Sequence, residues 1–164
     1  MNTKKIIIAF VVVFIILEIT NYLIYVGILG SAFENDMYKT VFRTEEDMNS
    51  KMWIMYVMDL IWSYFFVFFF VKGYENKGWM EGLRFGIYIG IFYMLVVSFQ
   101  YYAMFPLEFG LVLQMFIYAF IQVIILGIIT ALIYKPKAII LPAWEINRIR
   151  AAENNNSIKY RVIV

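Results

Sequence analysis

Four long apolar stretches constrain this chain more than any other feature of its sequence. A helix needs roughly 20 consecutive apolar residues to cross the hydrocarbon core of a bilayer, which is about 30 Å thick. Four stretches reach that length, at residues 6–28, 52–71, 83–105 and 107–134. The composition agrees, because 63% of the 164 residues are apolar and 16% are charged, whereas globular domains are about half apolar and about a quarter charged. We predict an all-α fold in which four transmembrane helices form an antiparallel bundle.

The basic residues that flank these stretches predict the orientation of the bundle. Lys and Arg are retained on the cytoplasmic side of a membrane, whereas acidic residues have little influence. If both termini are cytoplasmic, that side receives Lys4, Lys5, Lys72, Lys77, Arg84, Lys135, Lys137, Arg148 and Arg150. The opposite side then receives Lys39, Arg43 and Lys51. We therefore predict that both termini are cytoplasmic.

The chain divides into a membrane domain at residues 1–135 and a cytoplasmic tail at residues 136–164. Pro136 ends the last helix because proline cannot continue one. The tail is polar and has few means to fold alone. At the other end, the first stretch is longer than the 7–15 apolar residues of a signal-peptide core, so we expect it to be retained as an anchor. The connection at residues 30–51 is long enough for a short amphipathic element.

A glycine stripe marks one face of the third predicted span. Gly82, Gly86 and Gly90 are four residues apart, so they lie on the same side of a helix. In lipid, small residues allow two helix backbones to approach closely, and this close packing supplies association energy. We predict that the three glycines pack against another helix. A role along a substrate path is the alternative, and the sequence leaves open whether the neighbour belongs to this chain.

Each predicted span also carries polar side chains within its apolar run. They are Glu18 and Asn21 in the first span, Asp59 in the second, Ser98 in the third and Gln114 in the fourth. A helix rises 1.5 Å per residue. Counted from the predicted ends of the spans, these residues lie within several ångström of one depth, on the outer side of the midplane. We predict that they form one intramembrane polar layer.

Two acids, Glu18 and Asp59, share this predicted layer without a Lys or Arg. One such residue near the centre of a membrane costs about 2.5–3.5 kcal/mol on insertion scales, so two of them need an explanation. We expect at least one of the carboxyls to be protonated at neutral pH. One interpretation is a neutral carboxyl that hydrogen-bonds to Asn21, Gln114 or a tyrosine and holds the helices together. The other is a candidate ion or proton site that exchanges a proton for a cation or holds a cationic group.

Residue types that are absent exclude several chemistries. The chain has no cysteine and no histidine, so zinc sites built on these residues, iron–sulfur clusters and nucleophilic triads that depend on histidine are excluded. The net charge of +2 is too small to indicate a nucleic-acid partner. We predict that the chain is not an enzyme and that it has no catalytic, cofactor-binding or metal-binding residues.

Several short motifs are similar to those of a known group. The motifs are Lys51-Met-Trp-Ile-Met-Tyr-Val-Met-Asp59, Lys72-Gly-Tyr, Glu81-Gly-Leu-Arg-Phe-Gly86 with Gly90, and Gly127 with Leu132-Ile-Tyr-Lys-Pro136. Over residues 6–136 the chain resembles an uncharacterised family of small four-helix bacterial integral membrane proteins. The resemblance implies the same fold and a location in the bacterial inner (cytoplasmic) membrane. It implies no activity.

Three functions are compatible with these features. The preferred one is an accessory or structural subunit of a larger inner-membrane complex, whose partners are the lipid bilayer and other membrane protein subunits. The alternative is a small proton- or cation-coupled transporter in which Glu18 and Asp59 take up the coupling ion. A weaker alternative is a lipid or quinone binding module lined by Tyr56, Trp62, Tyr102 and Tyr118.

Overall fold

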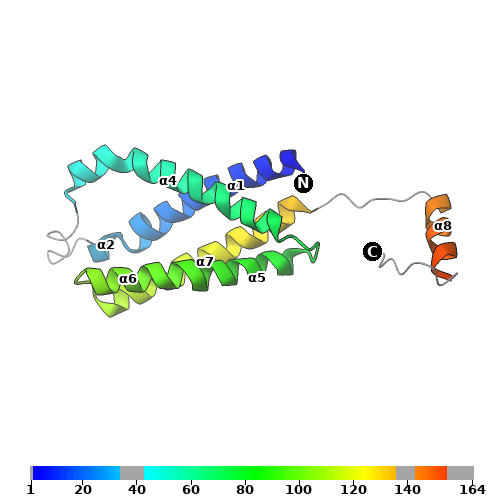
Figure 1. Cartoon of the computed structure of the whole chain (residues 1–164). Coiled ribbons are helices and arrows are strands. Elements are labelled where there is room, and N and C mark those ends of the chain that lie inside the picture. Colours follow the sequence, from blue (N-terminus) through cyan, green and yellow to red (C-terminus); the bar gives the residue numbers. More distant parts are fainter. Residues whose placement is uncertain (1, 34–42, 136–142, 155–164) are drawn as a thin grey trace.

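The fold is helical throughout the part of the chain that the structure describes. The computed structural model describes residues 2–33, 43–135 and 143–154 (Figure 1). Four helical segments are long and apolar enough to cross a membrane: Thr3–Ile28, Glu45–Lys72, Trp79–Met104 and Phe109–Tyr134. The prediction of an all-α fold with four candidate transmembrane helices is thereby confirmed.

Two of the four segments change from α-helical to π-helical geometry. α1 (Thr3–Asn21) continues into the π-helix η1 (Tyr22–Ile28), and the short α2 (Gly30–Phe33) follows. α5 (Trp79–Ile89) continues through the π-helix η2 (Gly90–Leu95) into α6 (Val96–Met104). The remaining helices are α4 (Glu45–Lys72), α7 (Phe109–Tyr134) and α8 (Ala143–Asn154).

α4 begins seven residues before the predicted start of the second span. The Thr44 hydroxyl caps the helix, accepting a hydrogen bond from the Asp47 backbone N–H at 3.4 Å. Glu45, Glu46 and Asp47 occupy the first turn, where the positive end of the helix dipole stabilises acidic side chains. The predicted connection at residues 30–51 therefore contains α2 and the start of α4, and residues 34–42 lie outside the described residues, as do residues 155–164 of the tail.

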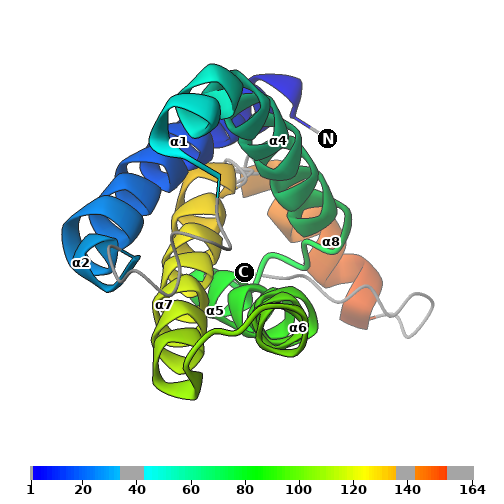
Figure 2. The same cartoon turned by 90° about the vertical axis from the view of Figure 1, so that its left-hand side faces the viewer.

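α7 is the central helix of the bundle. Viewed along the helices, it lies between α1 on one side and the continuous segment α5–η2–α6 on the other (Figure 2). α4 packs beside α1 and makes a smaller contact with α7. The bundle has two distinct ends. The Pro106 end carries the turn between α6 and α7, and the loop end carries residues 73–78 between α4 and α5.

The closest contact joins α5 to α7 through glycine. A Cβ added to Gly82 would collide with the backbone carbonyl of Gly127, and a Cβ on Gly127 would collide with the Gly82 carbonyl. A Cβ on Gly86 would lie 2.6 Å from the Cα of Ile124, and one on Gly90 would enter the Phe120 ring. The predicted glycine stripe therefore packs against α7 of the same chain.

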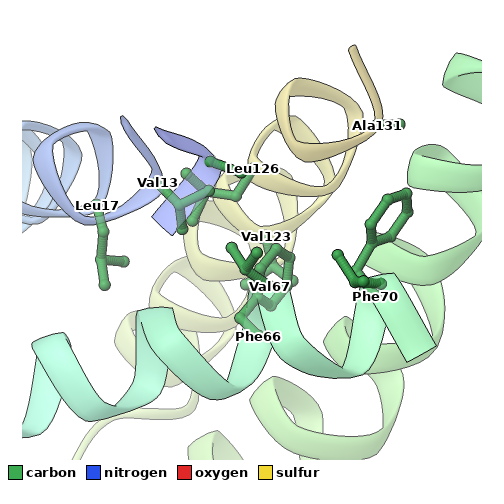
Figure 3. Close-up of a cluster of buried hydrophobic side chains, with 10 residues drawn as sticks. Val13, Leu17, Phe66, Val67, Phe70, Val123, Leu126 and Ala131 are labelled. Atoms are coloured by element: carbon green, nitrogen blue, oxygen red, sulfur yellow. The ribbon is translucent and has the colours of Figure 1, made fainter. Parts of the chain in front are cut away.

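α1 and α4 run antiparallel and share a regular stripe of buried residues near the loop end. The stripe comprises Ala9, Val13 and Leu17 from α1, and Ser63, Val67 and Val71 from α4. The apolar members belong to a core cluster that also includes Val123, Leu126 and Ala131 of α7 (Figure 3). On each helix the stripe residues are four apart and so occupy one face. The two helices therefore meet along one straight seam.

Beyond this seam, α4 leaves the bundle toward the Pro106 end. Six consecutive residues, Trp53 to Met58, are all at least 40% exposed. Six residues exceed one helical turn, so no face of α4 is covered there by the residues that the structure describes. At this end a second core cluster joins η1 to α7 through Ile24, Leu111 and Val112, without α4. The bundle is therefore closed at the loop end and splayed at the Pro106 end.

Glu81 fixes the loop between α4 and α5. Its buried carboxylate accepts hydrogen bonds from the backbone N–H groups of Glu75 and Lys77, the latter at 2.9 Å. Gly78 precedes α5 with φ at 74°, a conformation that glycine adopts without steric cost. The Glu75 side chain instead pairs with Lys77 at the surface, and the hydrogen bond from Lys77 lowers the pKa of Glu75. The buried acid, rather than the exposed pair, holds the loop.

We expect Glu81→Gln to destabilise the protein by about 1–3 kcal/mol. The amide NH₂ of glutamine would face a backbone N–H group whose hydrogen bond the carboxylate now accepts, and two donors cannot pair. The midpoint of thermal unfolding of the detergent-solubilised protein measures this effect. Glu75→Gln is the matched control, because it changes an exposed acid of the same loop and should leave the midpoint unchanged. Equal midpoints for both variants would contradict the role given to Glu81.

Candidate functional site

A chain of hydrogen bonds joins α1, α4 and α7 in the middle of the bundle. The Asn21 side-chain amide donates to Asp59 Oδ2 at 3.2 Å. The Gln122 side-chain amide donates to Asn21 Oδ1 at 2.9 Å and approaches Thr20 Oγ1 at 2.6 Å. Gln122 is only 6% exposed. Together with Glu18, these residues form the polar site.

Glu18 adds a second carboxyl to the polar site. It lies close enough to Asp59 for the two carboxyls to interact electrostatically. Its Oε1 atom is buried and has no hydrogen-bond partner among the described residues. Among the residues that the structure describes, no Lys or Arg forms an ion pair with Glu18 or Asp59. The polar site therefore holds two acids and no described compensating cation.

The polar site lies near the midpoints of the helices that form it. Asp59 precedes Lys72, the last residue of α4, by 13 residues, which is about 20 Å of helix. Gln122 precedes the end of α7 by 12 residues, or about 18 Å. A bilayer core is about 30 Å thick, so both side chains are deep within it if these helices span a membrane.

The π-helix η1 begins at the polar site. Its first residue, Tyr22, follows Asn21 directly. A π-helical turn changes the direction of the side chains beyond it and is often found at functional sites. Gln122 also donates to the backbone carbonyl of Leu17 at 3.4 Å, one turn before η1. Past the change in geometry, Tyr25 interacts electrostatically with Asp59 and with Tyr101 of α6. η1 thus adds Tyr25 to the polar groups near Asp59.

The structure brings together three of the five residues predicted to form the polar layer. Glu18, Asn21 and Asp59 meet in the polar site. Ser98 is buried on α6, but no hydrogen bond links it to the polar site within the described residues. Gln114 is exposed on α7, eight residues nearer the Pro106 end than Gln122. Gln122, rather than Gln114, joins the two acids.

The earlier start of α4 explains this difference. The sequence-based estimate counts the depth of Asp59 in the membrane from residue 52, the predicted start of the second span. That estimate places Asp59 near the Pro106 end of its helix, at the level of Gln114. Because α4 begins at Glu45, Asp59 lies in the middle of the helix, about 10 Å deeper than that count implies. Gln122 is at the matching depth on α7. The sequence does place Gln122 on the same helical face as Gln114, and that spacing was the available signal.

The aromatic residues predicted to line a lipid or quinone site are dispersed. Trp62 stacks on Phe66 beside the core cluster near the loop end. Tyr118 packs against the second cluster, at the Pro106 end. Tyr56 and Tyr102 are both exposed. No feature of the described residues gathers the four into one surface.

Packing around the polar site differs between the two ends of the bundle. Toward the loop end, Val13, Val67 and Leu126 are completely buried and close the space between α1, α4 and α7 (Figure 3). Toward the Pro106 end, α4 is exposed on all sides from residue 53 to residue 58. Asp59 stands at the boundary between these two regions. The helices around the polar site are therefore tightly packed on the loop-end side and separated on the Pro106 side.

Comparison with family models, with curated proteins and with solved structures finds no match for this chain.

Proposed function

We propose that this protein is a small proton- or cation-coupled membrane transporter in which Glu18 and Asp59 take up the coupling ion. The observation that carries the proposal is the meeting of two half-buried carboxyls, without a described basic partner, in a polar site at the middle of the bundle. Ionisable residues within transmembrane segments are costly, and they commonly mark ion pathways and proton relays.

The roles of the polar residues follow from their hydrogen bonds. Asn21 donates to Asp59 and thereby orients one carboxyl oxygen of that acid. Gln122 in turn holds Asn21 and Thr20 from the opposite helix. Glu18 and Asp59 repel one another when both are ionised, and a proton or cation bound between them removes that repulsion. Uptake of the ion thus changes the force between α1 and α4.

The unequal packing on the two sides of the polar site supports a transport cycle. A carrier must expose its site to each side in turn, and the described helices are packed at the loop end and splayed at the Pro106 end. The π-helices η1 and η2 supply places where the segments can change direction without losing their hydrogen bonds. We propose that ion uptake closes the splayed half of α4 onto the bundle and that the loop end then opens.

The proposed orientation and membrane follow from charge and resemblance. Lys72, Lys77, Arg84 and Lys135 lie at the loop end, and basic residues are retained on the cytoplasmic side. We therefore propose that both termini are cytoplasmic and that the Pro106 end faces outward. The bacterial inner membrane is proposed from the resemblance to small bacterial membrane proteins.

An accessory or structural subunit stays a second prediction without a specific observation in its favour. The glycine stripe, whose neighbour the sequence left open, packs against α7 of this chain and so is not available to a partner subunit. Partner subunits therefore need another contact surface. Purification from native membranes, followed by identification of co-purifying chains, tests this prediction separately from transport.

Ion flux in proteoliposomes tests the transport proposal. With Glu18→Gln or Asp59→Asn, we expect proton uptake driven by an imposed gradient to be almost abolished, measured with a pH-sensitive dye in the lumen. Glu46→Gln is the matched control, because Glu46 is an exposed acid in the first turn of α4, and its flux should equal that of the unmodified protein. Undiminished flux in both Glu18→Gln and Asp59→Asn would overturn the proposal.

A further inference from the structure

Two buried oxygen atoms near the polar site have no hydrogen-bond partner among the described residues. One is Glu18 Oε1, and the other is the Oγ atom of Ser63. Ser63 is completely buried, with 0% of its surface exposed. A buried polar group without a hydrogen-bond partner destabilises the folded state, so each such group in a folded protein calls for an explanation.

The register of α1 against α4 brings these two oxygens to one level. Asn21 contacts Asp59, and the helices run antiparallel with the same rise per residue. Leu17, one turn before Asn21, is therefore level with Ser63, one turn after Asp59. Glu18 is the neighbour of Leu17. The oxygens of Glu18 and Ser63 thus face the same layer of the α1–α4 seam.

The tilt of the side chains indicates where along the seam the oxygens of Ser63 and Glu18 lie. In a helix, each Cα–Cβ bond tilts toward the N-terminus. Ser63 therefore leans along α4 toward the turn of Asp59, on the same face. Glu18 leans along α1 away from Asn21, which is toward the level of Ser63. The unpartnered oxygens of Glu18 and Ser63 therefore lie at one level of the seam, within about one turn of Asp59, with which Glu18 interacts electrostatically.

We propose that Glu18, Ser63 and Asp59 bind a dehydrated sodium ion, and that this ion competes with protons for the polar site. The proposal rests on the proposed function and names its coupling ion. A sodium ion bound there would coordinate Glu18 Oε1 and Ser63 Oγ, the two oxygens that lack a hydrogen-bond partner. It would also neutralise part of the negative charge that the two acids place in the bundle.

The donor set and the packing select a small monovalent cation. All three side chains offer oxygen, the ligand atom that hard cations prefer. Calcium takes 6–8 oxygen ligands, whereas no group of three or more His, Cys, Asp or Glu side chains gathers anywhere in the described part of the chain. On the loop-end side, Val13 and Val67 are fully buried and fill the space next to the layer. An organic cation would not fit beside them.

Protons compete because sodium requires an ionised carboxyl. The titratable groups that interact with Glu18 and Asp59 are each other and Tyr25 from η1, and Tyr25 in turn interacts with Tyr101 of α6. α7 contributes the neutral Gln122. Protonation of Glu18 would convert a sodium ligand into a hydroxyl donor, so sodium binding should weaken as the pH falls.

Thermal unfolding of the purified protein in detergent tests the proposal. At equal ionic strength, we expect sodium chloride to raise the midpoint by about 5 °C over choline chloride when sodium is in large excess over its dissociation constant. The increase should shrink at acidic pH. Ser63→Ala and Glu18→Gln should lose the sodium-specific increase. Ser98→Ala, which alters a buried serine outside the polar site, should keep it.

Two results would overturn the sodium site. One is an equal midpoint in sodium and choline for the unmodified protein, and the other is a full sodium effect in Ser63→Ala. If that variant does not fold, binding of radioactive sodium to the unmodified protein decides, with one ion per chain expected and none contradicting the site. Proton flux that still depends on Glu18 and Asp59, without any sodium effect, would refute this inference alone and leave the proposed function standing.

Discussion

Gly82→Ala is expected to destabilise the protein strongly by forcing α5 away from α7. The added methyl group would collide with the backbone carbonyl of Gly127, and a backbone cannot move aside as a flexible side chain does. The two helices would have to separate along their whole contact. Overpacking typically costs about 1–3 kcal/mol and occasionally more, and we expect the upper end of that range. Chemical denaturation in mixed detergent micelles, followed by circular dichroism, measures the loss.

Gly110→Ala is the matched control for this prediction. Gly110 is also a glycine in a membrane helix, but a Cβ there would meet no atom within 4 Å among the described residues. Alanine has the higher helix propensity, so this exchange should be neutral or stabilising. If Gly82→Ala and Gly110→Ala proved equally stable, the close packing of α5 on α7 would be refuted.

Gln122→Met is expected to cost about 2 kcal/mol and to uncouple the polar site. Methionine nearly preserves the volume of glutamine, so the change removes hydrogen bonds rather than packing. Asn21 Oδ1 and the Leu17 carbonyl would lose the amide that now bonds to them. Hydrogen bonds between membrane helices contribute about 0.6–1.7 kcal/mol each, and leaving their partners unsatisfied adds to the loss. The free energy of unfolding in detergent is the measured quantity.

Gln114→Met provides the comparison on the same helix. Gln114 is exposed, so its replacement should change stability by less than about 0.5 kcal/mol. In the flux assay, Gln122→Met should also be impaired and Gln114→Met should not. A larger effect at Gln114 than at Gln122 would show that the sequence-based depth count, rather than the described register, is correct.

The helical segments and the glycine stripe were predictable because each depends on a local pattern. Uninterrupted apolar runs define the four candidate spans, and Pro106 breaks the run between the last two. The four-residue spacing of Gly82, Gly86 and Gly90 indicates a face for close packing, although only the structure shows that this face meets α7. The start of α4 was missed because its first turn is polar and depends on the Thr44 cap.

The polar site was predictable only in part, because its composition depends on how the helices are rotated and aligned. The presence of Glu18, Asn21 and Asp59 in membrane segments is a local fact. The choice between Gln114 and Gln122 depends on relative depth, and an error of one or two turns changes the partner. Ser63 lies one turn after Asp59, so the sequence places both on one face of α4, but its complete burial depends on packing against other helices. Glu81 contacts a nearby loop, and its burial is not apparent from the sequence.

Cysteine cross-linking between α1 and α4 examines directly whether these helices meet in the register that brings Glu18, Ser63 and Asp59 together. The chain contains no native cysteine, so introduced pairs report without interference. We predict efficient cross-linking in membranes for Val13→Cys combined with Val67→Cys, both on the buried seam. Ile15→Cys with Val67→Cys, which places one partner on the exposed face of α1, should not cross-link. Equal yields for the two pairs, or a higher yield for the second, would contradict this register and the polar site that depends on it.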